Sequence, residues 1–130
     1  MIPVLEKIDV SQNYSFVAKE VVKNAPQSLE EAWHFHPHIE LCFTSKSIGR
    51  RFVGNNISNY SEGDLILCGS HLPHGFVMPE NSVQLVIQFC PKFLGDDFFL
   101  TPELKHVNEM LERSKSVSYT HLTLPTTPYV

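Results

Sequence analysis

The sequence predicts an all-β domain, a sandwich or barrel of short antiparallel strands, followed by one short amphipathic helix. Short apolar-rich stretches alternate with turn residues over residues 16–89, and no helical pattern interrupts them. The length of 130 residues, 42% of them hydrophobic and 18% charged, fits one folded domain and excludes a disordered chain. A net charge of −4 does not suit a free-standing nucleic-acid-binding protein, and no apolar run approaches the ~20 residues of a membrane span.

The strands are expected in the following order. Residues 24–28 (NAPQS) form a loop, and residues 49–53 and 57–60 form a hairpin, because the Gly54-Asn55-Asn56 stretch between them tolerates positive φ. Residues 64–68 form the next strand. The last strand has one fully apolar face, since four apolar residues alternate with Gln84, Val86 and Gln88: Val83, Leu85, Ile87 and Phe89.

A helix is expected over residues 102–114. Thr101 is a favourable N-cap residue, and Pro102 suits the first helical position. Three apolar residues then recur at helical spacing, namely Leu104, Val107 and Leu111. This apolar stripe packs either on the barrel or on a second subunit.

The last 14 residues do not fit the pattern of the rest. Residues 117–126 (VSYTHLTLPT) match the translation, in one reading frame, of a transposon-based sequencing-library adapter. We therefore expect this tail not to be native and the native chain to continue past Ser116. The expected organisation has four parts: a lead-in (1–15), the barrel (16–90), a helical extension toward a missing DNA-binding domain (91–116) and the adapter-derived tail (117–130).

The histidines point to the chemistry. His34 and His36 are two residues apart, so on a strand both imidazoles face the same side. Glu40 would lie ~13 Å past His36 on an unbroken strand, so a shared site requires the chain to turn, for which Pro37 gives a reason. His74 follows the strand at residues 64–68. Imidazole and carboxylate ligands of this kind suit Fe, Mn, Ni or Zn, but the same side chains could instead hydrogen-bond one another or a small ligand.

Three segments carry a resemblance to a known family: WHFHPHIEL, IGRRFVGNNI and EGDLILCGSHLPHGF. The His-x-His-x3-Glu pattern, then Gly-Asp and later Pro-His, is similar to the two motifs of the cupin superfamily, a jelly-roll barrel. In this order and spacing the segments resemble the N-terminal sensor domain of AraC-family bacterial transcription regulators. Lys46 and Met78 stand where the cupin motifs usually have Gly and Asn.

The resemblance to metal-binding cupins implies a single metal inside the barrel, held by His34, His36, Glu40 and His74. The resemblance to the regulators implies an effector-sensing and dimerisation domain, which binds DNA only through a C-terminal helix-turn-helix part that this chain lacks. On that interpretation the chain is not an enzyme, forms a homodimer, has no membrane partner and takes a small, sugar-like effector.

The pocket lining expected from the sequence is Trp33, beside the histidine pair, and one of Arg50 and Arg51, which strand alternation turns inward. The three widely spaced cysteines are expected to be buried, reduced thiols of a cytoplasmic protein. Two other functions stay open. One is a stand-alone small metal-dependent cupin enzyme of the dioxygenase or isomerase type, and the other is a purely structural dimerisation domain with a filled barrel.

Overall fold

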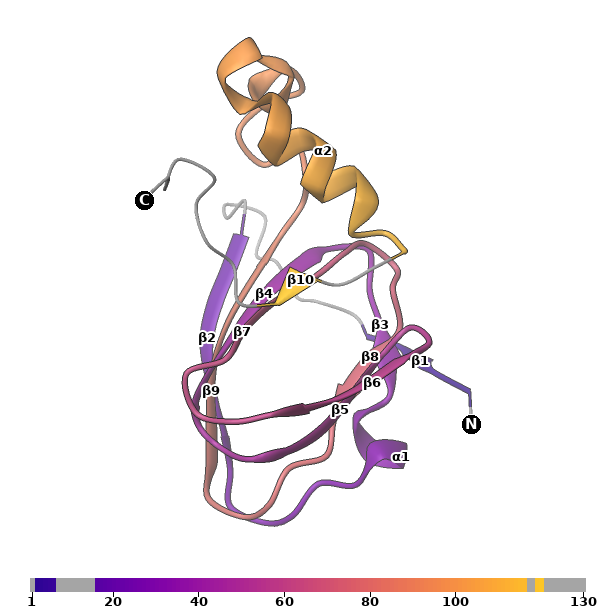
Figure 1. Cartoon of the computed structure of the whole chain (residues 1–130), viewed down its shortest axis with the longest axis vertical. Coiled ribbons are helices and arrows are strands. Elements are labelled where there is room, and N and C mark those ends of the chain that lie inside the picture. The colour runs from indigo at the N-terminus through magenta and orange to yellow at the C-terminus, as the bar shows by residue number, and fades with distance from the viewer. Residues whose placement is uncertain (1, 7–15, 117–118, 121–130) are drawn as a thin grey trace.

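The structure is a computed structural model that describes residues 2–6, 16–116 and 119–120. Its strands form two five-stranded sheets that face each other and enclose a barrel, with a helix over one end (Figure 1). The first sheet has the order β1-β3-β8-β5-β6, with β1 Val4–Leu5, β3 His34–Phe35, β8 His74–Phe76, β5 Gly49–Val53 and β6 Asn56–Tyr60. The second has the order β10-β7-β4-β9-β2, with β10 Tyr119–Thr120, β7 Leu65–Cys68, β4 Ile39–Lys46, β9 Ser82–Phe89 and β2 Phe16–Lys23.

Neighbouring strands are antiparallel except for the parallel pair β1 and β3. The predicted fold class is confirmed: the chain is a cupin-like jelly-roll barrel with a short helix toward its C-terminus. The β5–β6 hairpin closes as expected, because Val53 pairs with Asn56 and leaves a two-residue loop. Gly54 in that loop has φ 56°, a left-handed conformation that glycine adopts without strain.

A short helix, α1 (Leu29–Ala32), directly follows the expected loop at residues 24–28 and was not predicted. Its signal is a capping box. The Ser28 hydroxyl accepts a hydrogen bond from the Glu31 backbone N–H, and the Glu31 carboxylate accepts one from the Ser28 backbone N–H. The helix ends at Ala32, whose carbonyl then lies beside the first of the site histidines.

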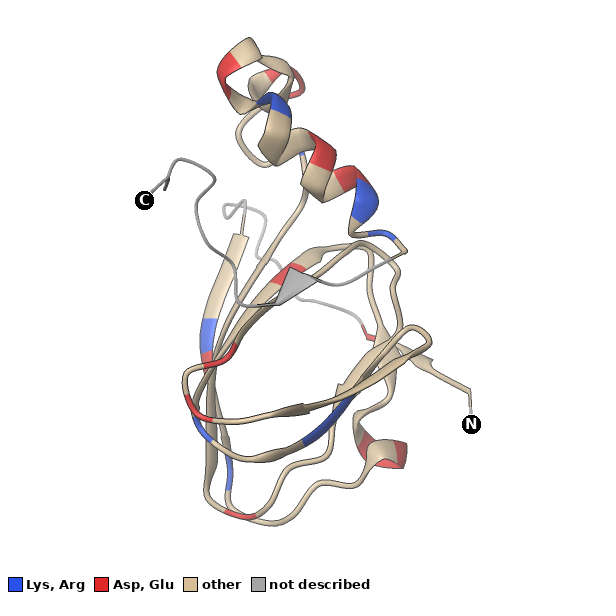
Figure 2. Ribbon diagram, in the orientation of Figure 1, with Lys and Arg blue, Asp and Glu red and all other residues tan. Residues whose placement is uncertain are grey.

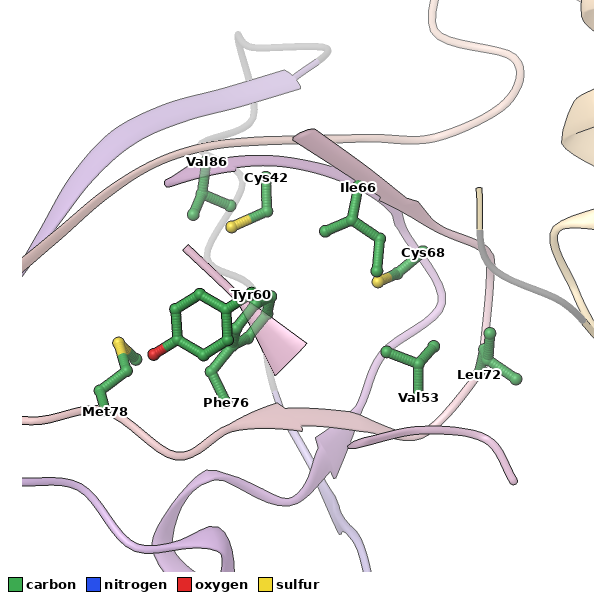
Figure 3. Close-up of a cluster of buried hydrophobic side chains, with 9 residues drawn as sticks. All are labelled: Cys42, Val53, Tyr60, Ile66, Cys68, Leu72, Phe76, Met78 and Val86. Carbon is green, nitrogen blue, oxygen red and sulfur yellow. The ribbon is translucent and has the colours of Figure 1, made fainter. Parts of the chain in front are cut away.

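The inside of the barrel holds a hydrophobic cluster that both sheets contribute to (Figure 3). Its buried members are Cys42, Val53, Tyr60, Ile66, Cys68, Leu72, Phe76, Met78 and Val86. Tyr60 also donates a hydrogen bond to the Val77 carbonyl, 2.8 Å away, so its hydroxyl is satisfied inside the core. This cluster closes one part of the barrel and leaves the part near β3 to polar side chains.

Strand β9 has the predicted alternation, but its apolar face points out of the barrel. The buried residues of β9 are Ser82, Gln84, Val86 and Gln88, while Leu85 and Ile87 are 45% and 41% exposed. The pairing with β4 contains a bulge between Thr44 and Lys46. The barrel interior is therefore lined by amides along this strand, and the apolar residues lie on the outer surface of the sheet.

The helical extension begins with two short 3₁₀ turns, Phe98–Leu100 and Pro102–Leu104, and continues as α2 (Lys105–Arg113). Val107 and Leu111 of α2 pack on Ile39 and Leu67 of the second sheet, in a second hydrophobic cluster outside the barrel. Leu104 is half-buried. The apolar stripe of the helix thus covers the chain's own barrel, which is one of the two arrangements expected from the sequence.

Acidic and basic residues are interspersed along α2 (Figure 2). None of the helices in the described part is long and apolar enough to cross a membrane.

Cys42 and Cys68 are buried free thiols, as expected, whereas Cys90 is exposed, because it lies just after β9 where the chain leaves the sheet.

Within the tail that we assigned to an adapter, Tyr119 and Thr120 pair with β7. Residues 117–118 and 121–130 lie outside the described residues, so the origin of the tail stays a prediction.

Candidate metal centre

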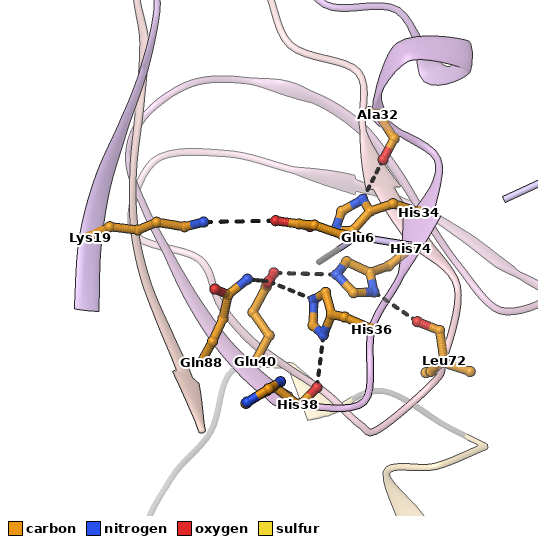
Figure 4. Close-up of polar contacts among 10 residues, drawn as sticks. All are labelled: Glu6, Lys19, Ala32, His34, His36, His38, Glu40, Leu72, His74 and Gln88. Carbon is orange, nitrogen blue, oxygen red and sulfur yellow. Dashed lines mark hydrogen bonds and ion pairs between the residues drawn. The ribbon is translucent and has the colours of Figure 1, made fainter. Parts of the chain in front are cut away.

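Four side chains from both sheets meet at one end of the barrel (Figure 4). His34 lies on β3, His36 directly after it, Glu40 on β4 and His74 on β8, opposite His34 in the ladder. One ligand atom from each of the four residues lies within 4.8 Å of the others. The structure therefore brings together all four residues that the sequence motifs singled out.

The chain turns between His36 and Glu40, at Pro37, as the spacing required. Strand β3 belongs to the first sheet and β4 to the second, so residues 36–38 carry the chain from one sheet to the other. The turn brings the Glu40 Oε1 atom to 3.2 Å from the His36 Nε2 atom. His36 and His74 are fully buried, Glu40 is 5% exposed, and His34 is half-buried at the edge of the site.

Each of the three histidines is oriented by a backbone carbonyl. The Nδ1 atoms contact carbonyl oxygens as follows: His34 contacts Ala32 (2.5 Å), His36 contacts His38 (2.9 Å) and His74 contacts Leu72 (2.8 Å). A carbonyl oxygen only accepts hydrogen bonds, so Nδ1 carries a proton in all three rings. In each neutral imidazole Nε2 then carries the lone pair that can bind a cation, and each Nε2 atom faces a carboxylate, that of His34 lying 3.1 Å from Glu6 Oε2.

Glu40 is the acceptor at the centre of this group. Its Oε1 atom accepts a hydrogen bond of 2.9 Å from the Gln88 side-chain amide and lies within hydrogen-bonding distance of His36. Burial raises the pKa of Glu40, but the charge on His74 and the hydrogen bond from His36 outweigh burial and hold this pKa well below its usual range. Glu40 is therefore a carboxylate.

Among the histidines, His74 has the strongest charge interaction with Glu40. Burial lowers the pKa of His74, but the Glu40 carboxylate more than offsets this, so that this pKa is raised. Burial, and then the charge on His74, lower the pKa of His34. The imidazoles of His34 and His74 therefore differ in their affinity for a proton. A charge on His74 is favoured by Glu40, and that charge disfavours a second one on His34.

The donor set fits a divalent transition metal. The His74 Nε2 atom is buried and has no hydrogen-bond partner among the described residues, although it lies 3.4 Å from Glu40 Oε2. His36 can donate from Nδ1 to the His38 carbonyl and from Nε2 to Glu40 at the same time only if both ring nitrogens carry a proton. A metal ion bound at Nε2 would take the place of the second proton. Three imidazole nitrogens and one carboxylate oxygen are ligands of Fe, Mn, Ni and Zn.

A cavity of about 450 Å³ adjoins the four residues and extends along the inner faces of β2 and β9. His34, Glu40 and Trp33 line it, so Trp33 lies where the sequence placed it. The sequence did not single out the other polar side chains of its wall, which are Glu6, Lys19, Lys23, Gln27, Glu31, Gln84 and Gln88. The glutamines of β9 could have been noticed, because amides at alternate positions of an apolar strand are unusual.

Neither Arg50 nor Arg51 lines this cavity, which corrects the predicted lining. Arg51 does turn inward: it is 3% exposed, its Nε donates to the Ser58 hydroxyl at 3.1 Å, and its Nη1 lies 3.7 Å from Asp64 Oδ2. Arg50, the next residue along the strand, is exposed. Arg51 joins the β5–β6 hairpin to the loop before β7 and is not a pocket residue.

Comparisons with known proteins find solved structures that resemble part of the chain. No protein-family model and no curated protein matches the chain. A cupin of RmlC type from Shewanella frigidimarina is 18% identical, with 59% of this chain and 68% of that chain covered and a TM-score of 0.48. A putative mannose-6-phosphate isomerase from Ralstonia eutropha is 14% identical, with 58% and 75% covered and a TM-score of 0.49. An oxalate decarboxylase variant from Bacillus subtilis is 20% identical, with 78% of this chain but 30% of that chain covered and a TM-score of 0.43.

These comparisons correct one expectation. We predicted that the chain is not an enzyme, and as a firm statement this is wrong. A putative mannose-6-phosphate isomerase, an oxalate decarboxylase and a polyketide cyclase are among the solved structures that the chain resembles.

Proposed function

We propose that this chain is a metal-dependent cupin domain that acts on a small, oxygen-bearing substrate in the cavity beside its metal centre. The observation that carries the proposal is the convergence of one ring nitrogen from each of three histidines and one carboxylate oxygen within 4.8 Å of one another, with the Nδ1 atom of each imidazole held by a backbone carbonyl. His34, His36, Glu40 and His74 hold the metal. When bound, a divalent metal of this kind supplies Lewis-acid chemistry to an oxygen ligand.

The protein's own residues supply the rest. The carbonyls of Ala32, His38 and Leu72 fix the three rings, so little reorganisation accompanies metal binding. Gln88 fixes the Glu40 carboxylate. His34 and Glu40 face the cavity, and the buried His36 and His74 face away from solvent, so a substrate approaches the metal from the cavity side.

The test is metal analysis of the chain purified without an affinity tag, by inductively coupled plasma mass spectrometry. We expect about one equivalent of a single transition metal, retained through gel filtration. The His36→Asn variant should lose it, and the His106→Asn variant should keep it, because the His106 side chain is 82% exposed on α2. Less than about a tenth of an equivalent after reloading with Fe, Mn, Ni and Zn in turn would contradict the proposal.

A second candidate function is the effector-sensing and dimerisation domain of an AraC-type regulator. The order of elements favours it, because a barrel is followed by an amphipathic helix that packs on it through Val107 and Leu111. In this role the same cavity takes a small effector, a second copy of the chain is the partner, and DNA is bound only by a part beyond Ser116. Free thiols fit a cytoplasmic location in either role.

The genomic locus separates the two candidates. A reading frame that continues past Ser116 with helix-turn-helix patterning favours the regulator, and a nearby stop codon favours the enzyme. Specific operator binding by the present chain in a gel shift would contradict the regulator interpretation, since the DNA-binding part is then not required.

A further inference from the structure

Gln88, which lines the cavity beside the metal centre, has a buried acceptor atom without a donor among the described residues. Gln88 is 2% exposed, and its Nε2 atom donates to the Glu40 carboxylate. A carboxylate only accepts, so this contact fixes which end of the Gln88 amide faces Glu40. The other end, Oε1, is buried without a hydrogen-bond partner among the described residues. A buried unsatisfied acceptor is costly, so Gln88 Oε1 calls for an O–H or N–H group supplied from the cavity.

The same cavity has two cations on its wall. Lys19 and Lys23 are four residues apart on β2 and both line the cavity with Val21 between them, as the period of a strand requires. Lys19 Nζ lies 3.9 Å from Glu6 Oε1, a long contact between partly exposed groups. Lys23 forms no hydrogen bond or ion pair within the part of the chain that the structure describes.

The charge balance of the cavity depends on the metal. Two lysines and three glutamates, Glu6, Glu31 and Glu40, line the cavity, which makes its metal-free wall net negative by one charge. A divalent metal at Glu40 reverses this to one net positive charge. The loaded cavity therefore attracts an anion, and Lys19 and Lys23 are the cations of its wall that can pair with it.

The remaining wall sets the size and shape of the ligand. Apolar side chains complete the lining, among them Val21, Val86, Phe76 and Met78. The cavity of about 450 Å³ is at the small end of ligand pockets. No arginine lines it, so the ammonium groups of the two lysines are the cations available to an anionic group of the ligand, and the small volume suits a short carboxylic acid.

We propose that the cavity binds a small hydroxycarboxylic acid. A hydroxyl group of the ligand donates to Gln88 Oε1, a carboxylate pairs with Lys19 or Lys23, and a short carbon skeleton packs on Val21 and Val86. This inference rests on the proposed function for the overall charge of the cavity, but the contacts with Gln88 and the lysines do not require the metal.

The experiment titrates the full chain, zinc-loaded and metal-free, with malate and with succinate, which lacks the hydroxyl. Trp33 is the one tryptophan of the chain and lines the cavity, so its fluorescence reports binding, and calorimetry gives the affinity. Malate should bind about five- to tenfold more tightly than succinate in both forms, as one hydrogen bond to a buried acceptor provides. The metal-free form matters, because there the hydroxyl cannot bind zinc.

Variants assign the contacts. The double variant Lys19→Met, Lys23→Met should bind malate at least about tenfold more weakly, whereas Lys105→Met, an exposed lysine on α2 outside the cavity, should leave binding unchanged. Gln88→Met should erase the preference for malate over succinate. Zinc content and thermal unfolding of each variant check the metal centre and the fold, and Gln88→Met is compared with the wild type in the metal-free form, because Gln88 also donates to Glu40.

Each result decides one point. Equal affinity for malate and succinate in the metal-free chain overturns the role of Gln88, and unchanged affinity in the double lysine variant overturns the role of the cations. If zinc binds at one equivalent and malate does not bind, this inference fails while the proposed function stands. If the metal-free chain binds malate in a lysine-dependent way but no metal is ever retained, the proposed function fails and this inference stands.

Discussion

Replacing His36 by Asn tests the metal centre without opening a hole in the barrel. His36 is fully buried, its Nδ1 donates to the His38 carbonyl, and its Nε2 faces Glu40. The amide nitrogen of Asn lies close to the position of Nδ1, so the variant keeps a donor for the His38 carbonyl and loses the Nε2 ligand. We expect the metal-free variant to fold and to lose about 1–2 kcal/mol of stability, the value of one buried polar contact.

The effect on metal binding is larger and follows from linkage. Zinc at 100 times its Kd stabilises the wild-type chain by about 2.7 kcal/mol, which raises the Tm of a domain of this size by about 10–20 °C. If the loss of one ligand weakens binding about 100-fold, the same zinc concentration stabilises the variant by only about 0.4 kcal/mol, a shift of about 2–3 °C.

The assay is thermal unfolding of the tag-free chain in zinc and in a chelator, with His106→Asn as the matched control. The control should show the full wild-type shift, because the His106 side chain is 82% exposed and lies on α2. A full shift in His36→Asn, or a lost shift in the control, would refute the assignment of the metal to the barrel.

Three further predictions concern pH, packing and thiols. Because the pKa of His74 is raised in the metal-free chain, protons compete with the metal for this ring as the pH falls. Zinc affinity, measured by competition with a chelator, should therefore drop from pH 8 to pH 6 by up to about tenfold per pH unit for each displaced proton, and a flat profile would contradict this. Gly69→Ala should cost about 1–3 kcal/mol in urea unfolding, because its new Cβ would overlap the backbone of Ser114 at the end of α2; an unchanged midpoint would show that the helix end moves freely. Of the three cysteines, only Cys90 should react with a thiol reagent in the folded chain and all three after unfolding, since burial raises the pKa of the other two thiols; fast labelling of more than one thiol in the folded chain would disprove their burial.

The sequence motifs singled out the four residues that the structure brings together in the candidate metal centre. Histidines two apart, followed by a proline and a glutamate, are rare by chance, and only a turn at Pro37 lets His36 and Glu40 meet. The structure shows that turn and adds what spacing cannot show, which is the carbonyl partner of each ring. Those partners depend on the loops that precede β4 and β8, and no local pattern specifies them.

The orientation of β9 could not be predicted. Alternation shows that a strand has two faces, but which one lies inside depends on what the rest of the barrel encloses. Here the interior holds a cavity with polar side chains in its wall, among them Gln84 and Gln88, which are buried while Leu85 is exposed. The same ambiguity applied to Arg50 and Arg51, of which only Arg51 turned out to face inward. A helix as short as α1 shows no helical periodicity in the sequence, and its capping box is the sequence signal that indicates it.

The inverted polarity of β9 has a consequence for folding. A shift of this strand by one residue against β2 and β4 would move Leu85 and Ile87 into the barrel and Gln84 and Gln88 out of it. The shifted chain would still have paired strands and would bury more apolar surface, but it would have no acceptor for a ligand and no donor for Glu40. The correct register is held by the eight residue pairs with β2 and by the bulge between Thr44 and Lys46. A refolded sample with the right strand content can therefore still lack its site, and metal retention, not the circular dichroism spectrum, is the measure of correct folding.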